Sequence, residues 1–217
     1  MVTRVTTVAF QGIEAVPVDV QVQIAPGQPK FLLVGLPDKA VKESGERVHA
    51  ALYASGLSLP PKRITVNLAP ADLPKEGSHY DLPIALGLMA AIGAIPSDAL
   101  SRHMAIGELG LDGRIAATAG VLPAAIAAGA NGLGIICPAA AGPEAAWAGE
   151  EIDIIAPESL LALVNHLAGH QLCARPVARR RADPVGLPDL SEVRGQDVAR
   201  RALEVAAAGG HNLLILG

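Results

Sequence analysis

An alternation of apolar and polar residues between positions 16 and 24 constrains the fold more than any other sequence feature. Valine or isoleucine occupies every second position, with Pro17, Asp19, Gln21 and Gln23 between them. A period of two sends alternate side chains to opposite faces of a strand. We therefore expect a half-buried strand here, paired with a second strand over Val2–Phe10.

Helix and strand patterns alternate along the following residues. The strand Phe31–Val34 precedes Asp38, which is a good N-cap for a helix that ends at Gly56, and Arg63–Leu68 alternates again. The other expected elements are helix Leu82–Ile92, a hairpin of Met104–Leu109 with Arg114–Thr118, helix Val121–Ala128, strand Leu133–Cys137, helix Pro143–Ala148, strand Ile152–Ile155 and helix Pro157–Leu167. This order predicts an α/β fold with a mixed sheet and helices on at least one face.

The composition excludes several classes of protein. Hydrophobic residues make up 51% and charged residues 18% of the 217 residues, which is typical of a folded α/β protein. The net charge of -4 gives no global basic field, so any contact with DNA must be local or lie elsewhere in a larger protein. Cys137 and Cys173 lack metal-binding spacing, and we expect no metal site. No signal peptide or membrane span is recognisable, so we expect a cytoplasmic protein without membrane partners.

The last part of the chain has a different character. Gln171–Pro188 is rich in arginine and proline and reads as a linker between residues 1–170 and 189–217. Alternatively, its basic cluster of Arg175, Arg179, Arg180 and Arg181 contacts phosphates.

A helix over Gln196–Ala208 and an apolar strand over Asn212–Leu216 follow the linker and end at Gly217. This order is typical of a strand that leads into a phosphate-binding loop. We expect the chain to stop before that loop, and the lone strand to be mobile, mispaired or aggregation-prone without its neighbours.

Four segments together resemble one family, the Mg-chelatase-like AAA+ ATPases of the YifB/ComM type. The resemblance covers essentially the whole chain and rests on the order and spacing of the segments. They are Val34–Asp38 with Glu43-Ser44 and Glu46-Arg47, Ile64–Asp72, Pro74–Ala85, and Gly195-Gln196 with Ala206–Leu214.

The resemblance implies a Lon-protease-like domain of βαβ units over residues 1–170, and the start of an AAA+ module over residues 189–217. It implies a hexameric ring that uses ATP and Mg²⁺ to drive branch migration of DNA in natural transformation or recombination. The alternatives are the ATPase subunit of a magnesium chelatase-like complex and a degenerate Lon-like hydrolase. Without the phosphate loop, we expect this chain alone to bind no cofactor and to have no ATPase activity.

Lon-type catalysis needs a serine nucleophile and a lysine base. By resemblance, Lys75 and Gly77 lie in the turn before the nucleophile, but Asp81 opens the helix where serine belongs. Leu122 occupies the position of the lysine, and no lysine follows Lys75 in the chain. We therefore expect a degenerate protease pocket and no catalytic residue.

For several candidate residues, the sequence allows two interpretations. Asp81 is either a helix N-cap or part of a retained pocket for a ligand or partner. Lys75 and Glu76 are either solvated loop charges or contacts between copies in a ring. By resemblance, Val193, Gly195, Gln196 and Gly217 bind nucleotide in the intact protein, while Gly195-Gln196 otherwise reads as a helix start.

Overall fold

A computed structural model of the chain describes residues 2–179, 186 and 188–216. The chain divides into two compact units, residues 1–179 and 180–217.

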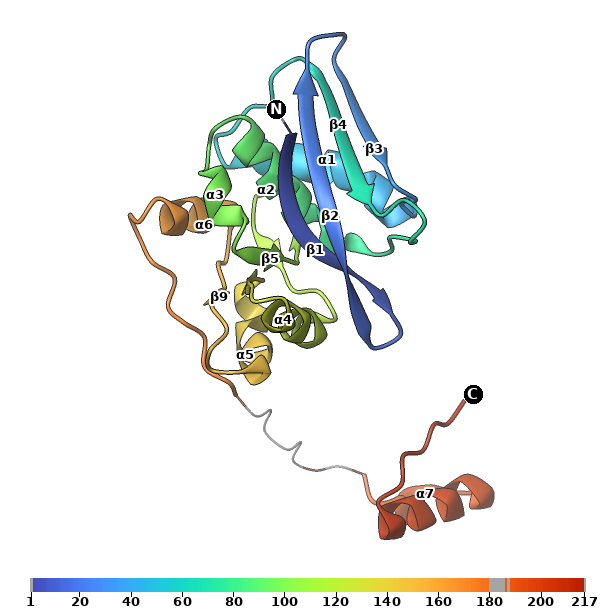
Figure 1. Cartoon of the computed structure of the whole chain (residues 1–217). Helices are drawn as coiled ribbons and strands as arrows, with labels where there is room; N and C mark the ends of the chain where they lie inside the picture. The colour runs from blue at the N-terminus through green and yellow to red at the C-terminus, as the bar shows by residue number, and fades with distance from the viewer. Residues whose placement is uncertain (1, 180–185, 187, 217) are drawn as a thin grey trace. The chain divides into compact units, whose positions relative to one another are not determined.

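A mixed seven-stranded sheet forms the frame of the first unit (Figure 1). β1 pairs antiparallel with β2, and β2 pairs antiparallel with β4, whereas the other neighbouring strands run parallel. The expected α/β fold with a mixed sheet is confirmed. In the order in which they lie in the sheet, the strands are β3 (Lys30–Val34), β4 (Arg63–Ala69), β2 (Glu14–Ala25), β1 (Val2–Gln11), β5 (His103–Ala105), β8 (Gly134–Ile136) and β9 (Ile154–Ile155).

Helices cover both faces of this sheet. On one side, α1 (Lys39–Ala54) and α2 (Asp81–Ala91) bury Val5, Val20 and Val66 in the larger core, and Figure 1 shows both helices behind β1, β2 and β4. On the other side, α4 (Val121–Ala130) packs with Val8 and Met104 in a second core. Because successive side chains of a strand point to opposite faces, Val5 and Val8 of β1 serve different cores.

Local sequence signals explain both helices of the larger core. The Asp38 carboxylate accepts a hydrogen bond of 2.7 Å from the Val41 amide, which confirms the expected N-cap of α1. In α2 nearly every side chain is buried, so the helix packs closely on the sheet. A Cβ added at Gly87 would lie 2.7 Å from Cγ2 of Val22, and Thr3 Oγ1 donates a hydrogen bond of 2.9 Å to the Gly87 carbonyl. The missing side chain at Gly87 therefore permits the close approach of α2 to β2 and its neighbour β1.

The expected hairpin over residues 104–118 is only partly correct. Met104 belongs to β5, which pairs with β1 in the main sheet, and the hairpin itself consists of β6 (Glu108–Leu109) and β7 (Ile115–Ala116). The cause is burial, since the side chains of β5 are buried on both faces of the sheet, as in a central parallel strand.

Short helices complete the first unit, and α3 was not predicted. They are α3 (Ser97–Leu100), α5 (Gly142–Ala145), α6 (Leu160–Leu167) and the 3₁₀ helices η1 (Ser78–Tyr80), η2 (Ala139–Ala141) and η3 (Ala146–Ala148). In the part of the chain that the structure describes, no helix is long and apolar enough to cross a membrane.

The second unit contains the 3₁₀ helix η4 (Leu190–Glu192) and α7 (Asp197–Gly209). The prediction of a strand over Asn212–Leu216 is wrong, because these residues form no strand and are exposed. A strand needs a hydrogen-bonded neighbour, and the described residues of this unit supply none.

Candidate functional site

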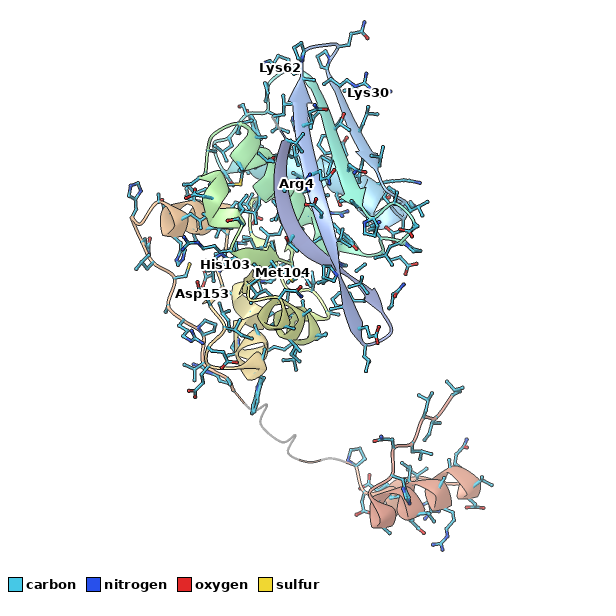
Figure 2. All side chains as sticks on the ribbon, in the orientation of Figure 1. Arg4, Lys30, Lys62, His103, Met104 and Asp153 are labelled. Carbon is cyan, nitrogen blue, oxygen red and sulfur yellow. The ribbon has the colours of Figure 1, made fainter. Side chains whose placement is uncertain are left out.

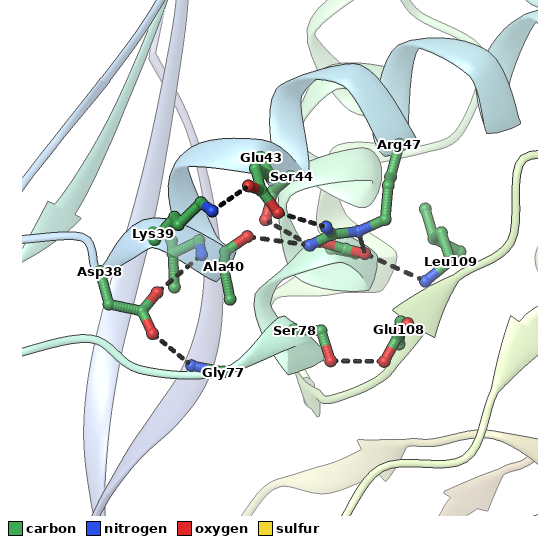
Figure 3. A network of polar contacts seen from close by, with 12 residues as sticks. Asp38, Lys39, Ala40, Glu43, Ser44, Arg47, Gly77, Ser78, Glu108 and Leu109 are labelled. Carbon is green, nitrogen blue, oxygen red and sulfur yellow. Dashed lines mark hydrogen bonds and ion pairs between the residues drawn. The ribbon is translucent and has the colours of Figure 1, made fainter.

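Asp81 stands at the start of α2 but does not cap it. It is the first residue of the helix, Tyr80 is the N-cap residue, and no side chain caps this helix end. The Asp81 carboxylate instead accepts two hydrogen bonds from Arg47 of α1, at 2.7 Å from Nε and 3.0 Å from Nη2 (Figure 3). The N-cap interpretation is therefore wrong, because a guanidinium from another helix takes both carboxylate oxygens.

The Arg47–Asp81 ion pair connects three segments of the fold. The Asp81 side chain is fully buried, whereas the Arg47 side chain is 22% exposed. The Leu109 amide of β6 donates a third hydrogen bond of 3.2 Å to Asp81, and Arg47 also donates 3.0 Å to the Ala40 carbonyl. The hydrogen bond to Asp81 raises the pKa of Arg47 above its usual value, so the guanidinium stays charged.

The loop before α2 has its own polar contacts. Gly77 donates its amide to the second carboxylate oxygen of Asp38 at 3.3 Å, and the Ser78 hydroxyl donates to the Glu108 carboxylate (Figure 3). His79 is buried, and its Nε2 lies 2.9 Å from the Val8 carbonyl oxygen. Ser78 and His79 thus contact different partners and do not form a nucleophile–base pair.

Lys75 is buried, so its interpretation as a solvated loop charge is wrong. Its ammonium donates to the Pro70 carbonyl, and its backbone pairs with the segment before α1, where the Asp38 amide donates 2.9 Å to the Lys75 carbonyl. Burial lowers the pKa of this lysine. Glu76 remains exposed and lines a hollow of about 600 Å³ together with Asp38 and Gly77.

Leu122 lies at the start of α4 and brings no amine to the site. Its backbone amide donates 3.1 Å to the Glu144 carboxylate. Its side chain lines an apolar hollow of about 560 Å³ with Phe10, Gly120 and Ile126. Neither Lys75, Gly77 nor Asp81 lines that hollow, so the structure does not assemble the expected residues into one pocket.

The residues proposed to bind nucleotide lie in the second unit. Val193 is exposed, and Gly195 and Gln196 adopt left-handed backbone conformations, with φ of 71° and 54°. Gln196 is the N-cap residue of α7, but its side chain makes no capping hydrogen bond. Gly217 lies outside the described residues, as do Arg180 and Arg181 of the basic cluster.

The other members of the basic cluster, Arg175 and Arg179, lie at the end of the first unit. Arg175 donates to the Glu150 carbonyl, and the Arg179 carbonyl accepts 3.4 Å from the Trp147 indole. Among the described residues, no group of three histidine, cysteine or acidic side chains is arranged to hold a metal ion.

Sequence reasoning assigned no role to Arg47 or Glu108. Arg47 stands in the Glu46-Arg47 segment on which the family resemblance rests, and that segment was the available signal. Its partner is 34 residues away in the sequence, so only the folded arrangement identifies the ion pair.

We expect removal of either charge of the ion pair to destabilise the first unit. Arg47→Met leaves the buried Asp81 carboxylate without its counterion, and Asp81→Leu leaves a partly buried guanidinium, each at a cost of about 3–5 kcal/mol. The double variant removes both charges and should recover much of that loss. Urea unfolding of the four proteins in a double-mutant cycle measures the coupling between the two sites. Additive effects of the two substitutions would contradict a coupled ion pair.

The buried His79 should make stability depend on pH. Burial lowers the pKa of its imidazole below the ordinary 6.5, so the unfolded chain binds this proton more readily than the folded chain. The free energy of unfolding should therefore fall as the pH decreases from about 7 to about 5. His79→Gln keeps an N–H donor for the Val8 carbonyl but does not titrate, and denaturant unfolding should show a shallower decline for this variant. Equal slopes for the two proteins would refute the assignment.

The comparisons with known proteins agree with one another. The family described as subunit ChlI of Mg-chelatase matches residues 20–141, and the family described as magnesium chelatase, subunit ChlI, matches residues 189–217.

Full-length relatives extend the similarity over nearly the whole chain. YifB of Escherichia coli K12 and YifB of Salmonella typhimurium are each 41% identical over 213 residues, which cover 98% of this chain. The competence protein ComM of Haemophilus influenzae is 40% identical over 214 residues, or 96% of this chain. In each case the match spans 42% of the relative's length. The chain belongs to the Mg-chelatase ChlI family, with YifB and ComM among its homologues.

Proposed function

We propose that this chain is the N-terminal, non-proteolytic part of an ATP-driven motor that promotes branch migration of DNA during natural transformation or recombination. The observation that carries the proposal is the state of Asp81. Where a Lon-type protease requires a free nucleophile, this fold has a buried carboxylate held by Arg47 and the Leu109 amide. The similarity to a relative named a competence protein supports the DNA-directed role.

The motor itself belongs to the AAA+ module that begins in the second unit. We propose that Val193, Gly195, Gln196 and Gly217 contact nucleotide in the intact protein, which uses ATP and Mg²⁺ in the cytoplasm. The match of residues 189–217 to the family described as magnesium chelatase, subunit ChlI, supports this assignment. As in other AAA+ motors, copies of the protein would form a ring, for which we propose a hexamer.

A magnesium chelatase ATPase subunit is the second candidate, and the similarity to the family of subunit ChlI of Mg-chelatase supports it. This role requires a porphyrin-handling partner and insertion of Mg²⁺ into porphyrin.

A degenerate hydrolase is the third candidate. Against it, the Ser78 hydroxyl donates a hydrogen bond to Glu108, and the described residues that line the hollow beside Asp38 and Gly77 include no lysine that could act as a base. Labelling by a fluorophosphonate would be needed to support it.

The full-length protein tests the proposal. We expect a four-way DNA junction to stimulate its ATPase activity more strongly than linear duplex of the same length. ATP, but not a non-hydrolysable analogue, should convert a labelled junction into its two duplex products, as resolved on a native gel. The linear duplex and the analogue serve as controls for non-specific binding and for simple nucleotide occupancy.

An ATPase rate that DNA leaves unchanged, together with no migration of the junction, would contradict the proposal. Porphyrin-dependent insertion of Mg²⁺ under the same conditions would then favour the chelatase role.

A further inference from the structure

Among the described residues, no helix covers one face of the sheet at the end formed by β3, β4 and the adjoining parts of β2 and β1. α1 and α2 cover the opposite face, and α4 packs on β5, β8 and the beginning of β2 (Figure 1). In β2 and β4, most of the residues that alternate with the buried apolar residues are polar, and the exceptions include Pro17, Ala25 and Ala69. We call this surface the open sheet face and define it by Arg4, Gln21, Gln23, Lys30, Arg63, Thr65 and Asn67, together with Lys62, which immediately precedes β4.

Positive charge is concentrated at one end of the open sheet face. Lys30 lies beside Arg63 in the register of β3 and β4, and the Lys30 amide donates 3.4 Å to the carbonyl of Lys62, which immediately precedes β4. All three side chains are exposed, and none forms an ion pair with another described residue. Figure 2 shows Lys30 and Lys62 at the same end of the strands. The net charge of the chain is -4, so this is a local segregation of charge.

Arg4 lies further along the same face, on β1. Its guanidinium contacts Asp19, the acidic residue of this face, at 2.9 Å. The registers place Arg4 opposite Gln21 and Gln21 opposite Asn67. Standard strand dimensions therefore separate Arg4 from Arg63 by about 13 Å along the strands and about 10 Å across them.

Neutral polar side chains fill the space between the charges. Asn67 donates 3.1 Å to Gln21, and Gln21 donates 2.7 Å to Asp19. Gln23 and Thr65 make no side-chain hydrogen bond to another described residue, so their donors are available to a ligand. Amide and hydroxyl groups between basic residues are typical of surfaces that contact phosphate oxygens.

The same surface is poorly suited to a protein partner. The core of a protein interface is depleted of charge and enriched in aromatic residues and methionine. Here the described outward-facing residues include no aromatic side chain, because Phe31 of β3 packs toward the larger core. The lack of an aromatic platform also disfavours stacking of single-stranded bases.

We propose that the open sheet face binds the phosphate backbone of double-stranded DNA without sequence preference. Lys30, Lys62 and Arg63 neutralise phosphates, and the polar side chains of β2 and β4 donate to further phosphate oxygens. The inference rests on the proposed function and adds a DNA contact in the first unit, separate from the ATPase module.

The test measures binding of fluorescein-labelled duplex to this 217-residue chain by anisotropy over a range of salt concentrations. The test variant is Lys30→Gln/Lys62→Gln/Arg63→Gln. The control variant, Lys39→Gln/Lys42→Gln/Arg102→Gln, removes the same charge from exposed residues elsewhere, two of them on α1 over the opposite sheet face. The test variant should bind at least tenfold more weakly at low salt, and the slope of log K against log salt should fall by about 2–3. The control variant should retain most of the affinity and slope.

Three results would overturn the inference: no binding of duplex by the chain, equal losses in the two variants, or preferential binding of single-stranded DNA. The far-ultraviolet circular dichroism and thermal unfolding of each variant verify that it folds. The full-length protein separates this inference from the proposed function. DNA-stimulated ATPase activity that survives the triple substitution unchanged would overturn the open sheet face alone. Binding that depends on this face in a protein without DNA-stimulated ATPase activity would overturn the motor alone.

Discussion

The ion pair between Arg47 and Asp81 is the constraint on which the larger core depends. It links α1 to the start of α2, and the Leu109 amide adds β6 through the same carboxylate. A buried carboxylate without a partner is strongly unfavourable, so these three segments must assemble together for the charge to be tolerated. The close packing of α2 on β1 and β2, which Gly87 permits, places Asp81 at the position where this network closes.

The same contacts determine the chemistry at the start of α2. The Asp81 carboxylate accepts three hydrogen bonds, and the side chain of Leu122 lines an apolar hollow. The accessible polar groups of the first unit lie instead in the loop around Asp38 and Gly77 and on the open sheet face. In the function that we propose, the ATP chemistry belongs to the AAA+ module and not to the first unit.

Local patterns predicted most of the elements, whereas long-range partners decided the errors. The alternation of β2 and the cap at Asp38 depend on neighbouring residues and were predicted correctly. Asp81 and Lys75 were misassigned because Arg47 contacts Asp81, and the segment before α1 pairs with the Lys75 backbone, only after folding. The apolar run over Asn212–Leu216 has strand composition, but without a paired neighbour it forms no strand. Thus the pattern of a segment identifies its intrinsic preference, and its charge partners and sheet neighbours determine the outcome.

Amide hydrogen exchange at Leu109 tests the central claim most directly, because this amide donates to the Asp81 carboxylate at the point where the three segments meet. We expect strong protection of the Leu109 amide in the wild-type chain, similar to that of the Val66 amide in the core of β4. Asp81→Ala should reduce the protection of the Leu109 amide far more than that of the Val66 amide. Rapid exchange of Leu109 in the wild-type chain, while Val66 remains protected, would contradict the claim that the buried ion pair holds this part of the fold together.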